Sequence, residues 1–181
     1  MKKQLNIVLL ALFLCAFFAY SAGAEGFPAN SSYKLAYSPG GNALQLITSA
    51  VDQAETSILV AAYTFTSKPI AVALLAAQKR GVKVMVVADA KSNTGRYSAI
   101  TFLANQGVPV WLNDRHAIMH NKFMVVDAKH VQTGSFNYSA AAVSRNAENV
   151  LVIFDAPALA SEYTEQWQRL WLEGKELKQS Y

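Results

Sequence analysis

The sequence predicts an α/β protein with a mixed, largely parallel β-sheet that is flanked by helices on both faces. Between residues 33 and 112, segments with strand character alternate with segments of helical periodicity and are joined by short loops. Two of the strand segments, 57–63 and 82–88, are apolar throughout, which is typical of strands covered on both faces. Residues 123–133 have the pattern of a hairpin, so part of the sheet should be antiparallel.

Start and stop signals delimit the elements in the first part of the chain. Asn42 can cap the first helix, and Ser67 precedes the second helix, which has Pro69 in its first turn. Gly81 follows that helix as a C-cap glycine, and residues 93–95 open a third helix. The predicted order is strand 33–37, helix 43–54, strand 57–63, helix 68–80, strand 82–88, helix 93–105 and strand 108–112.

The second part of the chain departs from this alternation. Its predicted elements are strand 123–126, strand 130–133, a short helix at 139–143, strand 149–154 and a helix from Pro157 to about Leu172. Three residues separate the first two strands, which is the spacing of an antiparallel hairpin. The apolar stripe of the last helix predicts burial in the core rather than a stacking platform. Its members are Leu159, Tyr163, Trp167, Leu170 and Trp171.

The first 24 residues have the pattern of a secretory signal peptide. Lys2 and Lys3 precede an apolar run from residue 7 to 19, and residues 22–24 form a small-residue cleavage site. The run is shorter than the roughly 20 residues that a spanning helix needs, which favours cleavage after Ala24 over an uncleaved anchor. We therefore expect a periplasmic or secreted protein, with residues 25–181 as a single domain and no stable membrane association.

Composition excludes some functions of the mature chain. The only cysteine, Cys15, lies in the signal segment, so neither a disulfide nor thiolate chemistry is expected. Loss of Lys2 and Lys3 leaves 14 of the 16 basic residues against 12 acidic ones, and this mild excess does not by itself indicate nucleic-acid binding. Basic residues gather between positions 79 and 145, which fits either an ordinary solvated surface or a local anion-attracting face.

The densest set of reactive side chains lies in and around the hairpin. His120 and Lys122 share one strand face by parity, about 6–7 Å apart, so one can attack phosphorus while the other holds a non-bridging oxygen. Ser135 and Asn137 end the returning strand and can hydrogen-bond phosphate oxygens without adding charge. Asp127 falls at the turn on the opposite parity, so we expect it to brace the hairpin through backbone N–H groups.

A carboxylate that could support the histidine comes later in the chain. A nucleophilic histidine must expose one neutral nitrogen, and a carboxylate on its other nitrogen fixes the tautomer and stabilises the phospho-adduct. Glu148, just before the last strand, is the candidate for this role. The alternative interpretation is an ordinary surface glutamate.

The combined pattern His120-x-Lys122-x4-Asp127 and Gly134-Ser135-x-Asn137 resembles the signature of the phospholipase D superfamily. With its length, export signal and single motif, the chain is most similar to the short, often plasmid-borne bacterial endonucleases of that family. The resemblance implies a metal-independent phosphodiesterase that passes through a phosphohistidine, with Asp127 and Gly134 as structural members of the motif. It also implies a homodimer, because single-motif members act as dimers whereas the lipases carry two motifs in one chain.

The chemistry also argues for two chains. A neutral histidine attacks phosphorus while a second, protonated group donates to the leaving oxygen, and one chain has one signature histidine. A two-fold axis brings the same patch of two chains together, so we expect His120 of the partner subunit to be the acid at a shared interface. Alternatives are His116 or His130 as the acid in a monomer, or a metal bound by His116 and His120 with an aspartate. The lack of further ligands at zinc spacing disfavours the metal, and no cofactor is expected.

Three functions compete on this basis. The first is a non-specific endonuclease that binds DNA, or alternatively RNA, through phosphate contacts rather than base edges. The second is a lipid phosphodiesterase, which would need an apolar rim or an amphipathic helix near the site; the sequence shows no obvious one. The third is a non-catalytic nucleic-acid-binding module, in which His120 is structural and dispensable for binding.

Overall fold

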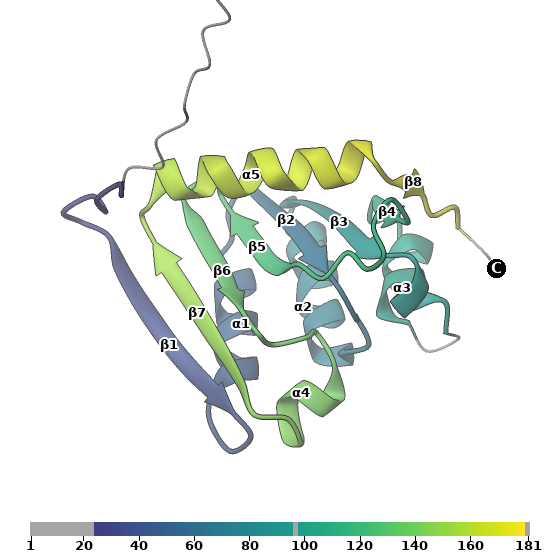
Figure 1. Cartoon of the computed structure of the whole chain (residues 1–181), viewed down its shortest axis with the longest axis horizontal. Helices are drawn as coiled ribbons and strands as arrows, with labels where there is room; N and C mark the ends of the chain where they lie inside the picture. Colours follow the sequence, from purple (N-terminus) through teal and green to yellow (C-terminus); the bar gives the residue numbers. More distant parts are fainter. Residues whose placement is uncertain (1–23, 96–97, 180–181) are drawn as a thin grey trace, which may run out of the picture.

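The computed structural model describes residues 24–95 and 98–179, which form an eight-stranded mixed sheet with helices on both faces (Figure 1). The strand order is β1-β7-β6-β5-β2-β3-β4-β8. The strands are β1 Ser32–Ser38, β2 Ser57–Ala62, β3 Lys83–Asp89, β4 Val110–Asn113, β5 Lys122–Val126, β6 His130–Gly134, β7 Glu148–Phe154 and β8 Lys175–Glu176. The helices are α1 Ala43–Asp52, α2 Lys68–Lys79, α3 Ala99–Asn105, α4 Ala140–Ser144 and α5 Pro157–Leu172, with a 3-10 turn η1 at Lys91–Asn93. The predicted α/β class and mixed sheet are confirmed.

The parallel part of the sheet is smaller than predicted. Only β2, β3 and β4 pair in parallel, and every other neighbouring pair is antiparallel, so the expectation of a largely parallel sheet holds for three strands alone. The helices α2 and α3 return the chain to a neighbouring parallel strand, whereas a tight turn joins β5 to β6 and forces an antiparallel pair. β1 lies at the sheet edge beside β7 and not beside β2. The sequence pattern did not predict this pairing, because a strand–helix–strand pattern does not specify which strands become neighbours.

Two elements differ from the sequence prediction. The third helix begins at Ala99 rather than near Asn93, because residues 91–93 form a separate 3-10 turn. The Asn93 side chain binds backbone groups of Tyr63 and Phe65 instead of capping that helix. β8, which pairs with β4, was not predicted, because its two charged residues carry no apolar pattern.

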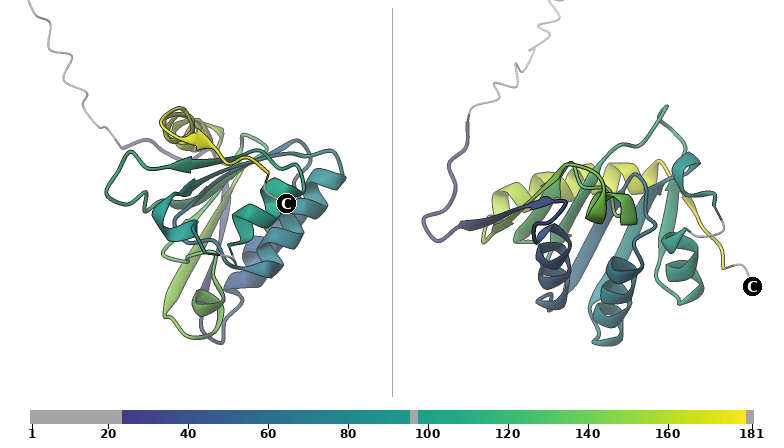
Figure 2. Two further views of the ribbon diagram at one scale, coloured as in Figure 1. Left: turned by 90° about the vertical axis from the view of Figure 1, so that its right-hand side faces the viewer. Right: turned by 90° about the horizontal axis from the view of Figure 1, so that it is seen from below.

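Two apolar cores lie on opposite faces of the sheet. The helices α1, α2 and α3 pack against one face, and α5 crosses the other face (Figure 2). Trp167 of α5 is buried, and its indole Nε1 donates a hydrogen bond to the Val60 carbonyl at 2.9 Å. The stripe of α5 is thus part of the core, as predicted from its helical spacing.

The predicted signal peptide lies outside the described residues, apart from Ala24. Within the ranges 24–95 and 98–179, no helix is long and apolar enough to cross a membrane. Signal cleavage and export therefore stay predictions.

The strand directions bring several element ends to one edge of the sheet. β2, β3 and β6 end at this edge, and β5 and β7 begin there. We call it the site edge and define it by Ala62, Asp89, Lys122, Gly134 and Glu148. In open α/β sheets, ligands bind outside the carboxyl ends of parallel strands, and here those ends belong to β2, β3 and β4.

Candidate active site

His120 and Lys122 lie together at the site edge but differ in exposure. His120, two residues before β5, is exposed, whereas Lys122 is only 8% exposed. The Lys122 ammonium donates a hydrogen bond to the His120 carbonyl oxygen at 2.9 Å. Burial lowers the pKa of Lys122, and the negative charge of Glu148 opposes that shift. A fixed cation therefore lies next to an accessible imidazole.

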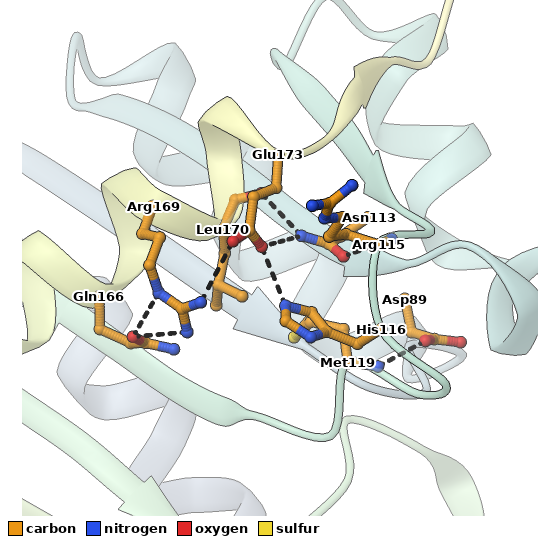
Figure 3. A network of polar contacts seen from close by, with 9 residues as sticks. All are labelled: Asp89, Asn113, Arg115, His116, Met119, Gln166, Arg169, Leu170 and Glu173. Atoms are coloured by element: carbon orange, nitrogen blue, oxygen red, sulfur yellow. Dashed lines mark hydrogen bonds and ion pairs between the residues drawn. The ribbon is translucent and has the colours of Figure 1, made fainter.

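The loop between β4 and β5, which carries His120, is anchored from two sides (Figure 3). Asp89, buried at the end of β3, accepts a hydrogen bond from the Met119 N–H at 2.8 Å. On the other side, His116 Nε2 lies 2.9 Å from a carboxylate oxygen of Glu173, which follows α5. These contacts fix the backbone at His120 without engaging its ring.

Glu148 hydrogen-bonds to Ser135 rather than to His120. The Ser135 hydroxyl donates to one carboxylate oxygen at 2.6 Å, and the Asn146 amide donates to the other at 3.0 Å. Within the described part of the chain, no hydrogen bond joins Glu148 to His120. The reason is the strand order, because β6 lies between β7 and β5 and Glu148 meets the end of β6 first. The expected carboxylate–imidazole pair is therefore not formed in this chain.

Gly134 allows β6 and β7 to approach closely at this edge. Its φ is +149°, and a Cβ added there would collide with the carbonyl group of Asn149. Because Phe123 pairs with Thr133, the β5–β6 register places Gly134 beside Lys122. A side chain at position 134 would therefore displace the strand end that carries Ser135.

Ser135 and Asn137 follow β6 and differ in their partners. Ser135 is exposed, and its backbone N–H and hydroxyl oxygen both bond to Asn149, at 2.7 and 3.0 Å. The amide oxygen of Asn137 is buried and has no hydrogen-bond partner among the described residues. Leaving a buried polar atom unpaired costs folding free energy, so the Asn137 amide oxygen is a candidate functional atom.

Asp127 lies at the opposite end of the hairpin from His120. Its carboxylate accepts hydrogen bonds from the backbone N–H groups of Glu55, Thr56 and Ser57, and from the Thr56 hydroxyl. Burial alone would raise the pKa of Asp127, but these donors hold it below its usual value. Asp127 thus joins the β5–β6 turn to the start of β2, so its carboxylate bonds to a neighbouring segment, whereas we expected it to brace its own hairpin.

The other two histidines have structural partners. His130 pairs with Val126 at the far end of the hairpin, where its Nδ1 accepts the N–H of Asp155 at 3.0 Å. His116 is held by Glu173. In residues 24–95 and 98–179, no group of three histidine, aspartate or glutamate side chains could hold a metal ion.

Tyr63 is a site residue that the sequence analysis missed. Its ring centroid lies 4.4 Å from that of His120, and the Lys122 ammonium lies 5.1 Å from the same tyrosine ring. Tyr63 directly follows β2, so it stands where the carboxyl ends of the parallel strands meet. That topological rule, applied to the strand predicted at 57–63, would have identified it.

Comparison with known proteins decides the family. A family model described as "Cardiolipin synthase, PLD-like domain" matches residues 47–171, which include the whole His120–Asp127 motif. The chain belongs to the phospholipase D superfamily. A curated relative from Rickettsia felis, named "Phospholipase D", is 37% identical over 137 residues, or 76% of this chain and 68% of the relative. A "Mitochondrial cardiolipin hydrolase" from Xenopus tropicalis is 35% identical over 67% of this chain and 57% of its own length.

Two solved structures show the same fold. The phospholipase D family member Nuc from Salmonella typhimurium aligns with a TM-score of 0.80 and 44% identity, over 82% of this chain and 99% of Nuc. NucT from Helicobacter pylori aligns with a TM-score of 0.73 and 26% identity, over 81% of this chain and 99% of NucT. The aligned part of this chain thus corresponds to essentially the full length of both solved chains.

Proposed function

We propose that this phospholipase D superfamily phosphodiesterase is a metal-independent endonuclease that cleaves DNA, or alternatively RNA, through a phosphohistidine at His120. The observation that carries the proposal is the accessible His120 imidazole beside the buried, fixed ammonium of Lys122. Resemblance to the short single-motif endonucleases and similarity to Nuc over nearly all of its length support nucleic acid as the substrate.

Positive charge around the His120 loop favours a polyanionic substrate. The Lys91 ammonium donates a hydrogen bond to the Ala117 carbonyl at 3.1 Å, and Arg115 is exposed in the same loop. These cations can contact phosphates near the scissile bond. Because phosphate contacts carry no sequence information, we expect cleavage with little sequence preference.

The reaction proceeds by two displacements at phosphorus. A ring nitrogen of His120 attacks, the P–O bond to the leaving sugar breaks, and a protonated group donates a proton to that oxygen. Water then attacks phosphorus, the N–P bond breaks, and the water gives up a proton to the same group, which releases the phosphate monoester and free His120. Lys122, Ser135 and Asn137 stabilise the additional negative charge on the phosphoryl oxygens.

The proton donor is supplied by a second chain in this proposal. His116 and His130 are both engaged elsewhere, so His120 of the partner subunit is the remaining histidine. A two-fold axis through the site edge would place the two His120 side chains on opposite sides of the phosphate. The Glu148 carboxylates would then lie at the same interface.

An uncovered apolar face next to the site edge supports this dimer. Tyr33, Leu35 and Tyr37 of β1 are 71%, 48% and 58% exposed on the α5 side of the sheet, beyond the reach of α5 itself. Tyr37 pairs with Asn149, whose side-chain oxygen accepts the Ser135 N–H, so the apolar face ends beside a site residue. Its three side chains expose on the order of 300–400 Å², a size typical of functional patches. We propose that a second copy of the chain covers it.

One assay separates the nuclease from its alternatives. The purified protein, in excess chelator, is incubated with plasmid DNA, with RNA and with phosphatidylcholine vesicles. Cleavage of DNA or RNA alone supports the proposal, whereas lipid turnover alone supports the lipase that the names of several relatives suggest. Loss of activity in the chelator would contradict the metal-free mechanism. DNA binding without cleavage, equal in wild type and His120→Ala, would favour the non-catalytic module.

A mixing experiment tests whether two chains share one active site. Titrating wild-type chains with His120→Ala chains should depress activity below the wild-type fraction, because mixed dimers lack one of the two histidines. Activity that follows the wild-type fraction would contradict the shared site.

Sedimentation of the Leu35→Glu variant tests the apolar face of β1. If the charge at position 35 leaves the dimer intact, this face is not the interface. A mature N-terminus at Glu25 in the periplasm or medium would support export.

A further inference from the structure

We propose that Tyr63 is a positioning residue for this reaction, and that its ring orients the His120 imidazole and holds the Lys122 ammonium. The inference rests on the proposed function, because it assigns a role in the chemistry at His120. It concerns a residue outside the motif and outside the elements that carry the motif. Tyr63 comes from the end of β2, which pairs with β5 in the sheet centre.

The first observation is that the Tyr63 ring contacts both reactive groups. It meets the His120 ring at a centroid distance of 4.4 Å and an interplanar angle of 62°, which is an edge-to-face arrangement. The Lys122 ammonium lies over the Tyr63 ring at 5.1 Å from its centroid, within the range of a cation–π contact. The Tyr63 ring therefore contacts both the His120 imidazole and the Lys122 ammonium.

The second observation concerns the polar surroundings of the His120 ring. Among the described residues, no hydrogen bond reaches the imidazole nitrogens, and both Glu148 oxygens are occupied by Ser135 and Asn146. The edge-to-face contact with Tyr63 therefore restricts the His120 side chain where no hydrogen bond does. Reactions that depend on a near-attack geometry are sensitive to such restriction.

The third observation is that Tyr63 is itself held rigidly. The buried amide of Asn93 donates to the Tyr63 carbonyl at 2.6 Å and to the Asp89 carbonyl at 2.8 Å, and it accepts the Phe65 N–H at 2.9 Å. Downstream, the N–H groups of residues 66 and 67 bond to the Tyr138 carbonyl. A residue fixed at both ends by backbone contacts can position its neighbours.

Charge explains why an aromatic ring suits this place. Attack on phosphorus converts the neutral imidazole into a positively charged phospho-adduct next to the ammonium of Lys122. The negative face of an aromatic ring attracts cations, so Tyr63 stabilises the ammonium and the developing charge. Its phenol oxygen makes no hydrogen bond in the described part of the chain, so the ring and not the hydroxyl carries this role.

The test compares Tyr63→Leu, Tyr63→Phe and the remote control Phe102→Leu, an equivalent aromatic-to-leucine change on the outer side of α3. Hydrolysis of bis-p-nitrophenyl phosphate is measured, because this diester needs neither DNA nor lipid contacts. We expect kcat to fall about tenfold in Tyr63→Leu with KM nearly unchanged, as for loss of one desolvated cation–π contact. Tyr63→Phe should retain most of the wild-type kcat, and Phe102→Leu should match wild type.

A second readout is independent of turnover. The proton resonances of the His120 ring should carry a ring-current shift that persists in Tyr63→Phe and disappears in Tyr63→Leu. Wild-type kcat in Tyr63→Leu, a Tyr63→Phe variant as impaired as Tyr63→Leu, or an unchanged His120 resonance would overturn the proposal. A wild-type protein that hydrolyses no phosphodiester would refute the proposed function instead, and the His120 resonance would still decide whether Tyr63 positions the ring.

Discussion

Replacement of Asp127 by alanine should destabilise the protein and leave the chemistry of each folded molecule intact. The Asp127 carboxylate accepts the N–H groups of Glu55, Thr56 and Ser57 at 2.7–3.2 Å, and its own backbone has a φ of +53°. Three partly solvated bonds contribute roughly 2 kcal/mol together, since water replaces much of what each loses. Alanine in the left-handed region adds about 1 kcal/mol, because it lacks the local bonding that lets aspartate tolerate this conformation.

A loss of about 3 kcal/mol predicts a decrease in Tm of roughly 6–12 °C for a chain of this length. Asp127→Asn is the matched control, because asparagine tolerates a positive φ and keeps one acceptor oxygen, so it should lose about half as much. Urea unfolding measures both variants, and initial rates per folded molecule are taken far below the transition. An Asp127→Ala protein with wild-type stability and lost turnover would refute the reasoning and make this carboxylate part of the reaction.

The same contact predicts a pH dependence of stability. The folded-state pKa of Asp127 lies below its ordinary value of 3.8, so its stabilisation is present above that value and disappears as the pH falls through the folded-state pKa. The difference in unfolding free energy between wild type and Asp127→Ala should therefore shrink in acid. A constant difference down to strongly acidic pH would contradict an ionic origin.

Two further variants test the site edge. In Glu148→Gln, the loss of negative charge should lower the pKa of Lys122 further. The alkaline limb of the pH–rate profile should therefore move to lower pH. An unmoved limb would show that Glu148 does not act on this ammonium. In Gly134→Ala, the added Cβ meets the carbonyl of Asn149. We expect the free energy of unfolding in urea to fall by about 1–3 kcal/mol and the activity to decrease. Wild-type stability would contradict the close approach of β6 and β7.

Local patterns in the sequence predicted most elements of this fold. The hairpin around Asp127 and the stripe of α5 were predicted from spacing alone, because both depend on residues close in the chain. The sheet order was not predicted, since neighbours such as β1 and β7 are more than a hundred residues apart. The short strand β8 also lacked a signal, because its pairing with β4 depends on where α5 ends.

The site residues also differ in whether local sequence could predict their contacts. His120 and Lys122 were identified from parity and chemistry, and the structure places them together. The partner of Glu148 could not be predicted, because it depends on β6 lying between β5 and β7. Tyr63 was missed because an aromatic residue at the end of a buried strand has the composition of a core residue, although its place at the carboxyl end of a predicted parallel strand was a usable signal.

In the proposed mechanism, His120 forms the covalent intermediate without a metal ion. The most direct measurement is a rapid alkaline quench of the protein turning over end-labelled DNA in excess chelator, followed by peptide mapping. Alkaline conditions preserve the N–P bond of a phosphohistidine. We predict labelled DNA attached to the peptide that contains His120, and no label in His120→Ala. Label on another residue, or full turnover by His120→Ala, would contradict it.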